Sequence, residues 1–494
     1  MAEKYRLVVV GGGVAGLEIA TRLAGKRTGA QHLSVTLIDR EPAYVWKPML
    51  HTIAAGTADA GLQETVFAAR ALTHGFRYEF GEAIRVDRQQ HMVFLAPLTI
   101  EGEEIVPQRG VPYDTLVLSV GSRANDFGTP GVAAYCLRID TRSDAVAFND
   151  RLRVHLVKSI ALGRKLRVGI VGGGATGVEL AAELIQVATV AERYGIAGAS
   201  SHLEIILVES GPRLLGPFPE PVAEAALKKL QQLGVTVRTG ARVSSVDANG
   251  FTLNGDELVG AELKVWAAGV KAPPLIDTLA DLERTRSGQL IVGPTLRTAG
   301  DDDIYALGDC ASPQLPGRDV PVPNFAQAAS QHAQYLSRHL PKLIAGEVVP
   351  PASYKDFGGL VALGGYDAYG TLGRFGFYKG GFIKVRIAQL GHAMLYRRYQ
   401  ASLHGIWRGT LLWFLDTVGR KVRPRAGFLK TARRTATFTV LVGKCQIGNN
   451  EVGITRLPEQ KHRSEVPAHP PGGTWCHRPF HRAGRFSTKA RGPS

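Results

Sequence analysis

Two glycine-rich segments of the chain have the residue types and spacing of a phosphate-binding loop. Each follows a short β-branched run, reads Gly-x-Gly-x-x-Gly and precedes a helical pattern. The motif glycines are Gly11, Gly13 and Gly16 in the first copy and Gly172, Gly174 and Gly177 in the second. The first glycine permits a tight turn, the second lets backbone approach a pyrophosphate, and the third lets helix and strand pack closely. Two copies predict two dinucleotide sites, whereas the alternative is a glycine-rich turn that binds nothing.

An acid follows each motif at the end of a second predicted strand. Asp39 stands 23 residues after Gly16, and Glu209 stands 32 residues after Gly177. An acid about 20 residues after such a motif accepts hydrogen bonds from ribose hydroxyls. A carboxylate at Glu209 would also repel a 2′-phosphate, which predicts NADH rather than NADPH. The longer second spacing predicts an elongated helix or an added loop, and the alternative for both acids is an ordinary exposed position.

The elements that must position these motifs indicate two nested α/β domains. Residues 1–125 and 295–350 are expected to form one dinucleotide-binding domain, interrupted by a second domain at 150–290. Matched late strands of the two units end in Gly121 and Gly269. We therefore expect an α/β fold with two Rossmann-like domains. Residues 351–430 form a third region, and residues 431–494 change composition again.

Composition narrows the classes of chemistry that this chain can perform. It has 494 residues, 45% of them hydrophobic and 21% charged, which excludes a small stapled scaffold and a wholly disordered chain. Four cysteines, Cys136, Cys310, Cys445 and Cys476, form no Cys-x-x-Cys or Cys-x4-Cys pair. Neither a zinc cluster nor a redox dithiol is expected, and the scattered histidines predict no metal site. The net charge of +16 favours an anionic partner.

The location of the positive charge along the chain bears on whether the anionic partner is a membrane or a nucleic acid. The chain starts directly in a strand pattern and has no apolar run long enough to span a bilayer, which predicts a cytoplasmic protein without a cleaved signal. Within 394–425, apolar and aromatic residues recur at helical spacing beside basic ones. This pattern predicts an interfacial helix on anionic lipid, although a helix docked on its own domain would look the same. The tail 431–494 carries half of the net charge and is expected to be disordered, or even an out-of-frame extension.

Together, the paired motifs and the run 304–309 resemble the flavoprotein reductases with two dinucleotide domains, the pyridine nucleotide-disulfide oxidoreductase superfamily. In that superfamily the first unit holds FAD and the second holds NAD(P)H. The resemblance assigns Lys47, Gly121, Gly308 and Asp309 to FAD, with the Asp309 carboxylate on the ribityl chain, and Gly269 to NADH. The alternative for Asp309 is an ordinary turn aspartate.

Three segments, 46–50, 266–270 and 324–331, resemble the type II NADH:quinone oxidoreductases within that superfamily, and the resemblance covers about residues 5–430. It implies FAD-dependent oxidation of NADH and two-electron reduction of a membrane quinone, without proton pumping. The expected location is peripheral, at the cytoplasmic face of the inner (plasma) membrane. The absence of cysteine between positions 44 and 69 argues against disulfide reduction.

The resemblance also implies three catalytic residues. Gln327 and Gln331 stand four apart, so on a helix they share a face, and in the family such a pair borders the quinone site. Glu179, expected in the first turn of the second motif's helix, matches a glutamate with a proposed role in proton delivery. The alternatives are a solvated helix face for the glutamines, with Ser330, His332 and other polar neighbours, and a helix-dipole acid for Glu179.

Two other functions remain open at this point. One is a soluble NAD(P)H-dependent reductase of a ferredoxin or rubredoxin-type carrier, whose acidic surface would meet the basic charge. The other is a redox sensor whose basic tail binds nucleic acid, against which the quinone-side segments argue. The sequence leaves open which quinone is used and whether the protein forms a homodimer.

Overall fold

The computed structural model describes residues 4–28, 31–193, 195–317, 321–363, 367–371 and 377–378. The chain divides into two units, Met1–Thr431 and Ala432–Ser494, and every described residue belongs to the first. The predicted lipid-binding segment 394–425 and the tail 431–494 therefore lie outside the described residues, and both stay predictions.

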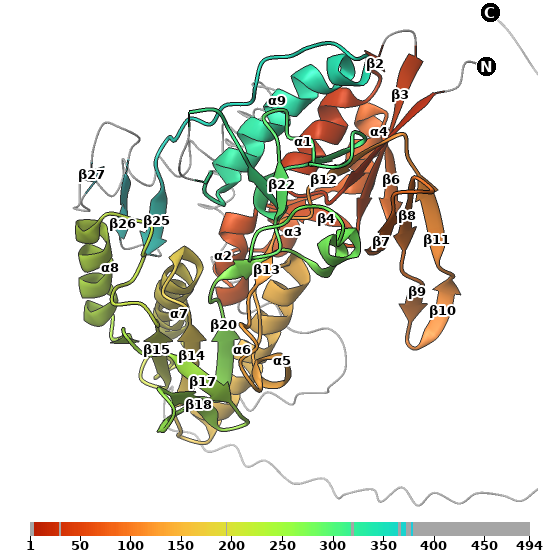
Figure 1. The fold of residues 1–494 in the computed structure, drawn as a ribbon. Helices are drawn as coiled ribbons and strands as arrows, with labels where there is room; N and C mark the ends of the chain where they lie inside the picture. The colour runs from red at the N-terminus through yellow and green to blue at the C-terminus, as the bar shows by residue number, and fades with distance from the viewer. Residues whose placement is uncertain are drawn as a thin grey trace, which may run out of the picture. The chain divides into compact units, whose positions relative to one another are not determined.

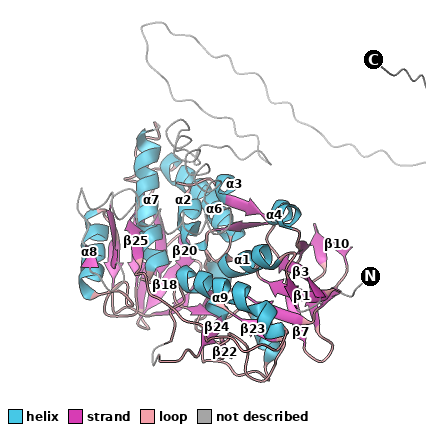
Figure 2. Ribbon diagram, turned by 90° about the horizontal axis from the view of Figure 1, so that it is seen from above, coloured by secondary structure: helices cyan, strands magenta, loops and turns pink. Residues whose placement is uncertain are grey.

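The first motif lies in a sheet with the order β2-β3-β1-β12-β23, and β6 pairs with β3 beyond it. The strands are β1 (Tyr5–Val10), β2 (Arg27–Thr28), β3 (Gln31–Asp39), β6 (Arg77–Phe80), β12 (Thr115–Leu118) and β23 (Ile304–Ala306). Strands β3, β1, β12 and β23 run parallel, and their β-branched side chains are buried as both faces of the sheet are covered. Helix α1 (Val14–Leu23) lies beside α9 (Ala326–Ile344) in both views (Figures 1 and 2).

The second motif lies in a parallel sheet with the order β16-β15-β14-β20. These strands are β14 (Leu166–Val171), β15 (Leu203–Val208), β16 (Thr236–Arg238) and β20 (Leu263–Trp266). The motif is followed by α7 (Ala175–Arg193), which has 19 residues where α1 has 10. The expectation of a longer second helix is confirmed, and so is the α/β class. Sequence order places this whole sheet between β12 and β23 of the first.

Smaller elements complete the described part of the chain. The remaining strands are β4 (Ala43–Val45), β5 (Glu64–Val66), β7 (Ala83–Asp87), β8 (Met92–Leu95), β9 (Leu98–Ile100), β10 (Glu103–Val106), β11 (Arg109–Pro112), β13 (Arg123–Ala124), β17 (Val243–Val246), β18 (Gly250–Leu253), β19 (Glu257–Gly260), β21 (Val270–Lys271), β22 (Leu290–Val292), β24 (Ala311–Pro313), β25 (Leu360–Leu363), β26 (Asp367–Thr371) and β27 (Phe377–Tyr378). The remaining helices are η1 (Lys47–Met49), α2 (Leu50–Ala55), α3 (Ala60–Gln63), α4 (Phe67–His74), α5 (Val132–Tyr135), α6 (Arg142–Ala161), α8 (Glu220–Gln232), η2 (Pro274–Leu279) and η3 (Gly308–Cys310). No helix among the described residues is long and apolar enough to cross a bilayer.

The two sheets are joined by more than the chain crossings between them. The two chain segments that connect the sheets also pair with each other, because β13 of the first connection runs antiparallel to β21 of the second. Helix α2 lies between the first motif and β6 in sequence, but it packs against α6 and α7, which lie beside the second motif's sheet (Figure 2). Ile53 of α2 and Val361 of β25 are buried in the same hydrophobic core as Leu180 of α7. The hydrophobic core around the second sheet therefore includes residues that precede this sheet in sequence and residues that follow it. The candidate site lies where these segments meet.

Candidate active site

The first glycine motif forms a cradle in which the helix N-terminus faces open space. A Cβ on Gly16 would lie 1.9 Å from the carbonyl oxygen of Gly11, so a side chain there would force the turn apart. A Cβ on Gly13 would meet nothing within 4 Å. Helix α1 begins at Val14, and no side chain caps it at Gly13. A helix N-terminus beside open space fits the pyrophosphate of FAD, since a helix N-terminus attracts anions.

Asp39, at the end of β3, is tied to this motif by hydrogen bonds. Its carboxylate accepts from the backbone N–H of Gly12 at 2.5 Å and from that of Glu41 at 2.8 Å. Burial raises the pKa of Asp39, and these two hydrogen bonds act in the opposite direction. The acid is therefore held against the motif rather than fully exposed at a strand end. Its contact with a ribose stays a prediction.

The other residues assigned to FAD meet around Ser122, which the sequence did not single out. The Nζ atom of Lys47 donates to the carbonyl oxygen of Ser122 at 2.8 Å, and the Ser122 hydroxyl donates to Asp309 Oδ2 at 2.8 Å. Gly121 and Gly308 flank this group, and both have left-handed backbone, with φ of +67° and +74°. A hydroxyl after β12, a carboxylate after β23 and a lysine of η1 together fit the hydroxylated chain of a flavin.

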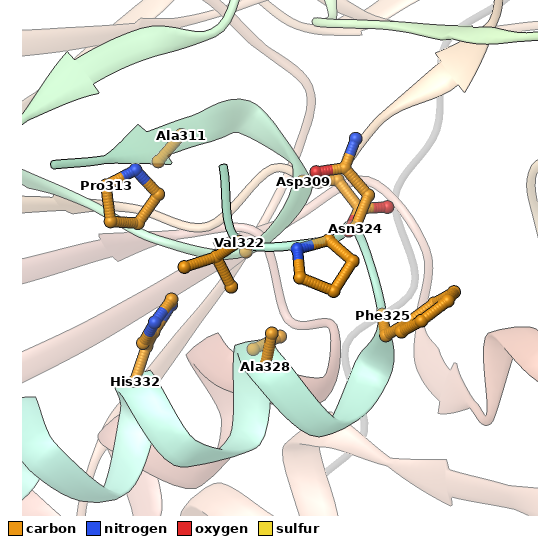
Figure 3. Close-up of a pocket in the computed structure, with 11 residues that line it drawn as sticks. Asp309, Ala311, Pro313, Val322, Asn324, Phe325, Ala328 and His332 are labelled. Atoms are coloured by element: carbon orange, nitrogen blue, oxygen red, sulfur yellow. The ribbon is translucent and has the colours of Figure 1, made fainter. Parts of the chain in front are cut away.

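A pocket opens beside Asp309 and under the first turns of α9 (Figure 3). Asn324, Phe325 and Ala328 line it, and the ring of His332 points into it. The sequence grouped His332 with polar residues of a solvated helix face, but the structure buries it to 2% exposure. The helix turns this position toward the core instead. Burial lowers the pKa of His332 to about 4, and no described residue hydrogen-bonds to either ring nitrogen.

The second motif repeats the geometry of the first. A Cβ on Gly177 would lie 2.0 Å from the carbonyl oxygen of Gly172, whereas one on Gly174 would meet nothing within 4 Å. The Glu209 carboxylate accepts from the backbone N–H groups of Gly173 and Gly211, both at 2.6 Å. This arrangement fits the pyrophosphate and ribose of a second dinucleotide.

Gly269, assigned to NADH by the resemblance, lies between β20 and β21, three residues after β20 ends. It has left-handed backbone, with φ of +58°, and a Cβ there would lie 2.5 Å from the ring of Phe127. The left-handed backbone favours glycine at this position, and a side chain there would have to displace the exposed Phe127 ring.

Glu179 departs from its expected environment. It is the fifth residue of α7, beyond the first turn, because the helix already begins at Ala175 within the motif. Its side chain is buried, with one oxygen accepting from the backbone N–H of Ala362 at 3.0 Å and the other 3.4 Å from His51 Nδ1. Burial, assisted by the nearby Glu183 carboxyl, raises the pKa of Glu179 to about 8. The helix-dipole interpretation is therefore wrong, and the group can hold a proton at neutral pH.

Gln327 and Gln331 lie on one face of α9, as their spacing predicts, and this face is not merely solvated. Gln331 donates to the carbonyl oxygen of Lys355 and accepts from its N–H, both at 2.9 Å. Gln327 donates to Gly358 O at 3.0 Å and accepts from the N–H of Phe357 at 3.2 Å. Both side-chain amides thus bind an extended backbone segment that the sequence did not single out.

The three predicted catalytic residues converge on this one segment. Gln331 and Gln327 bind its first half from α9, and Glu179 binds Ala362 in its second half from α7. We call residues 355–362 the bridging segment, because it connects the helix beside Asp309 with the helix of the second motif. The adjacent glycines at 358 and 359 were its signal in the sequence, since the hydrogen bonds that join it to α9 and α7 are long-range.

The two cysteines within the described residues, Cys136 and Cys310, give no sign of sulfur chemistry. Burial raises the pKa values of Cys136 and Cys310 to about 12, so both thiols stay protonated and poorly nucleophilic. No cluster of three or more metal-ligating side chains occurs within the ranges that the structure describes.

Comparison with known proteins identifies the family. A family model described as pyridine nucleotide-disulphide oxidoreductase matches residues 5–333. The type II NADH:quinone oxidoreductase of Haemophilus influenzae is 36% identical over 440 residues, which cover 85% of this chain and 98% of the relative. The chain belongs to the type II NADH:quinone oxidoreductases, within the pyridine nucleotide-disulphide oxidoreductase family.

A further relative and a solved structure extend the comparison. The type II NADH:quinone oxidoreductase NdhA of Mycobacterium tuberculosis is 28% identical, over 76% of this chain and 80% of its own. The structure of NDH2 from Plasmodium falciparum in complex with NADH aligns with a TM-score of 0.73 and 20% identity, covering 86% of this chain and 100% of that one. The expected resemblance to type II NADH:quinone oxidoreductases is confirmed, and so is the shared fold.

Proposed function

We propose that this protein uses FAD to oxidise NADH and reduces a membrane quinone by two electrons, without proton pumping, with Glu179, Gln327 and Gln331 on the quinone side. The carrying observation is the bridging segment, on which these three residues converge from α7 and α9. A soluble reductase of a protein electron carrier is not favoured, because the two relatives described above are named for quinone reduction.

FAD supplies the redox chemistry when bound, accepting hydride from NADH and passing two electrons to the quinone. The protein's part is to bind and orient. The open cradle at Gly13 and the group formed by Lys47, Ser122 and Asp309 would hold the flavin nucleotide. The cradle at Gly174 and the carboxylate of Glu209 would hold NADH, whose free ribose 2′-hydroxyl can donate to that carboxylate.

The reaction also needs a proton that NADH does not supply. NADH delivers a hydride, which amounts to two electrons and one proton, whereas a quinone takes up two electrons and two protons. Glu179 is the side chain best suited to hold the second proton, because it is buried and its pKa is raised to about 8. Its carboxyl would donate that proton to a quinone oxygen and then be reprotonated from solvent.

Quinones reside in the bilayer, so this function requires peripheral contact with a membrane. The basic, aromatic segment 394–425 is the part of the sequence suited to an anionic lipid surface, and the expected side is the cytoplasmic face of the inner membrane. Co-sedimentation with anionic and with neutral vesicles tests the contact, before and after a cut following Lys430. We expect binding to anionic vesicles to survive the cut. Loss of binding would assign the contact to the tail.

The decisive experiment is NADH oxidation by the purified holoenzyme with and without a water-soluble short-chain quinone, repeated with NADPH. We expect fast turnover that depends on the quinone and prefers NADH. Flavin that NADH reduces but the quinone does not reoxidise would contradict the proposed function and redirect attention to protein electron carriers.

A further inference from the structure

The two glycine motifs are followed by acids at equivalent positions, which allows a comparison within one molecule. Glu18 stands two residues after Gly16 in α1, and Glu179 stands two residues after Gly177 in α7. Both side chains are buried, at 0% and 8% exposure. The repeated strand, glycine motif and helix thus place a buried carboxyl at the same position after each motif.

The residue four positions after this buried acid differs between the two helices. In α1 it is Arg22, whose Nε donates to Glu18 Oε1 at 2.9 Å, and Ser330 donates to the other oxygen at 3.1 Å. In α7 it is Glu183, a second buried acid. A guanidinium one turn away stabilises the ionised form of a buried carboxyl, whereas a second carboxyl one turn away favours the protonated form.

Glu183 is held in place by a residue from the part of the chain that carries the first motif. Thr57, which follows α2, donates its hydroxyl to Glu183 Oε2 at 2.7 Å. The groups around Glu179 come from three elements: Glu183 on α7, His51 on α2 and the backbone N–H of Ala362 on β25. Two acids and a histidine in one buried site titrate as a coupled group rather than singly.

We propose that Glu183 is a positioning residue for quinone reduction, whose carboxyl keeps a proton on Glu179 until the quinone accepts it. The role rests on the proposed function. In the step, the Glu179 O–H bond breaks and a quinone O–H bond forms, while the electrons come from NADH and none passes through the two acids. The carboxylate left on Glu179 then takes one proton from solvent, so that NADH, one proton and a quinone give NAD⁺ and a quinol.

Two substitutions at position 183 test this role against a merely structural one. Glu183→Gln keeps the shape and the acceptor for Thr57 but replaces the ionisable carboxyl by a neutral amide. We expect the pH above which quinone turnover declines to fall by about one unit. Glu183→Arg reproduces the Glu18–Arg22 arrangement, should ionise Glu179, and should lower quinone turnover at pH 7 by about tenfold or more. Flavin reduction by NADH, measured in single turnover, should be unchanged in both.

The control is Glu18→Gln, which removes the matched buried carboxyl of the other unit and should leave the alkaline limb of the pH profile in place. Infrared spectra give a readout without turnover, since the band of a buried protonated carboxyl should be present in the wild type and lost in Glu183→Arg. If Glu183→Arg does not fold, the isosteric Glu183→Gln decides alone. An alkaline limb in Glu183→Gln identical to that of the wild type overturns the proposal. A wild-type holoenzyme that does not reduce quinone at all overturns the proposed function, and this role with it.

Discussion

Gln331 and Lys355 are joined by two hydrogen bonds in opposite directions, from the glutamine side chain to the lysine backbone, both at 2.9 Å. A glutamine amide used in this way substitutes for a neighbouring strand. Because the next helical turn repeats the arrangement through Gln327, the bridging segment is fixed along α9 before it reaches Glu179. The two glutamines, which we propose border the quinone site, thus also bind the bridging segment, which the sequence did not reveal.

Replacing Gln331 should loosen the bridging segment. Gln331→Ala removes both hydrogen bonds to Lys355, each worth about 1 kcal/mol, so we expect KM for the quinone to rise about tenfold. Steady-state kinetics with a short-chain quinone measures this, while single-turnover flavin reduction by NADH should be unchanged. Gln334→Ala is the control, since Gln334 bonds to Ser330 on its own helix. An equal loss in the NADH half-reaction would show that the segment serves the flavin instead.

The carboxylate of Glu209 should decide between NADH and NADPH. Glu209→Gln keeps an acceptor but loses the charge that we propose binds the ribose hydroxyls and repels a 2′-phosphate. Hydrogen bonds to charged groups are worth about 1.5–3 kcal/mol, so the preference for NADH in kcat/KM should fall by about tenfold or more. Glu204→Gln is the matched control. Glu204 lies on β15, the strand that precedes Glu209, and forms an ion pair with Arg167 of β14. An unchanged ratio would leave Glu209 as a purely structural acid of the motif.

The second motif separates a glycine needed by the fold from one needed by the ligand. Gly177→Ala places a Cβ against backbone, 2.0 Å from Gly172 O, and should destabilise the protein by about 2 kcal/mol or more. Gly174→Ala meets no protein atom within 4 Å, so its melting temperature should equal that of the wild type while KM for NADH rises. Thermal unfolding and steady-state kinetics check the two effects. A destabilised Gly174→Ala protein with normal KM would remove that glycine from the nucleotide site.

His332 should make the protein less stable in mild acid. Its pKa in the folded state is about 4, against about 6.5 in the unfolded chain, so between these values the unfolded chain binds the proton and stability falls as pH decreases. His332→Met should reduce this decline and raise stability at neutral pH by about 1 kcal/mol, since a buried polar ring is removed. Urea unfolding at pH 7 and pH 5 measures both. A larger decline in the variant would contradict a buried neutral ring, and His339→Met, on the same helix, is the control.

The folding pattern was largely readable because its signals are local. The β-branched runs before Gly11 and Gly172 became parallel strands, and the helices began at or beside the motif glycines. Glycine spacing encodes a turn and a close approach that depend only on neighbouring residues. The positions of Asp39 and Glu209 were predictable from local signals too, because each acid stands at the end of the strand that brings the chain back beside its motif. The membrane segment 394–425 lies outside the described residues and stays a prediction.

The sequence by itself determined two dinucleotide cradles, their acids and the α/β class, since each depends on short-range backbone geometry. Only the tertiary structure decided that Glu179 is buried between α2, α7 and β25, that Glu183 meets Thr57, and that His332 points inward. These relationships join residues more than a hundred positions apart or depend on which side of a helix faces the core. The free energy of a charge depends on its surroundings in space, so the protonation of Glu179 could be inferred only after folding had brought its neighbours together.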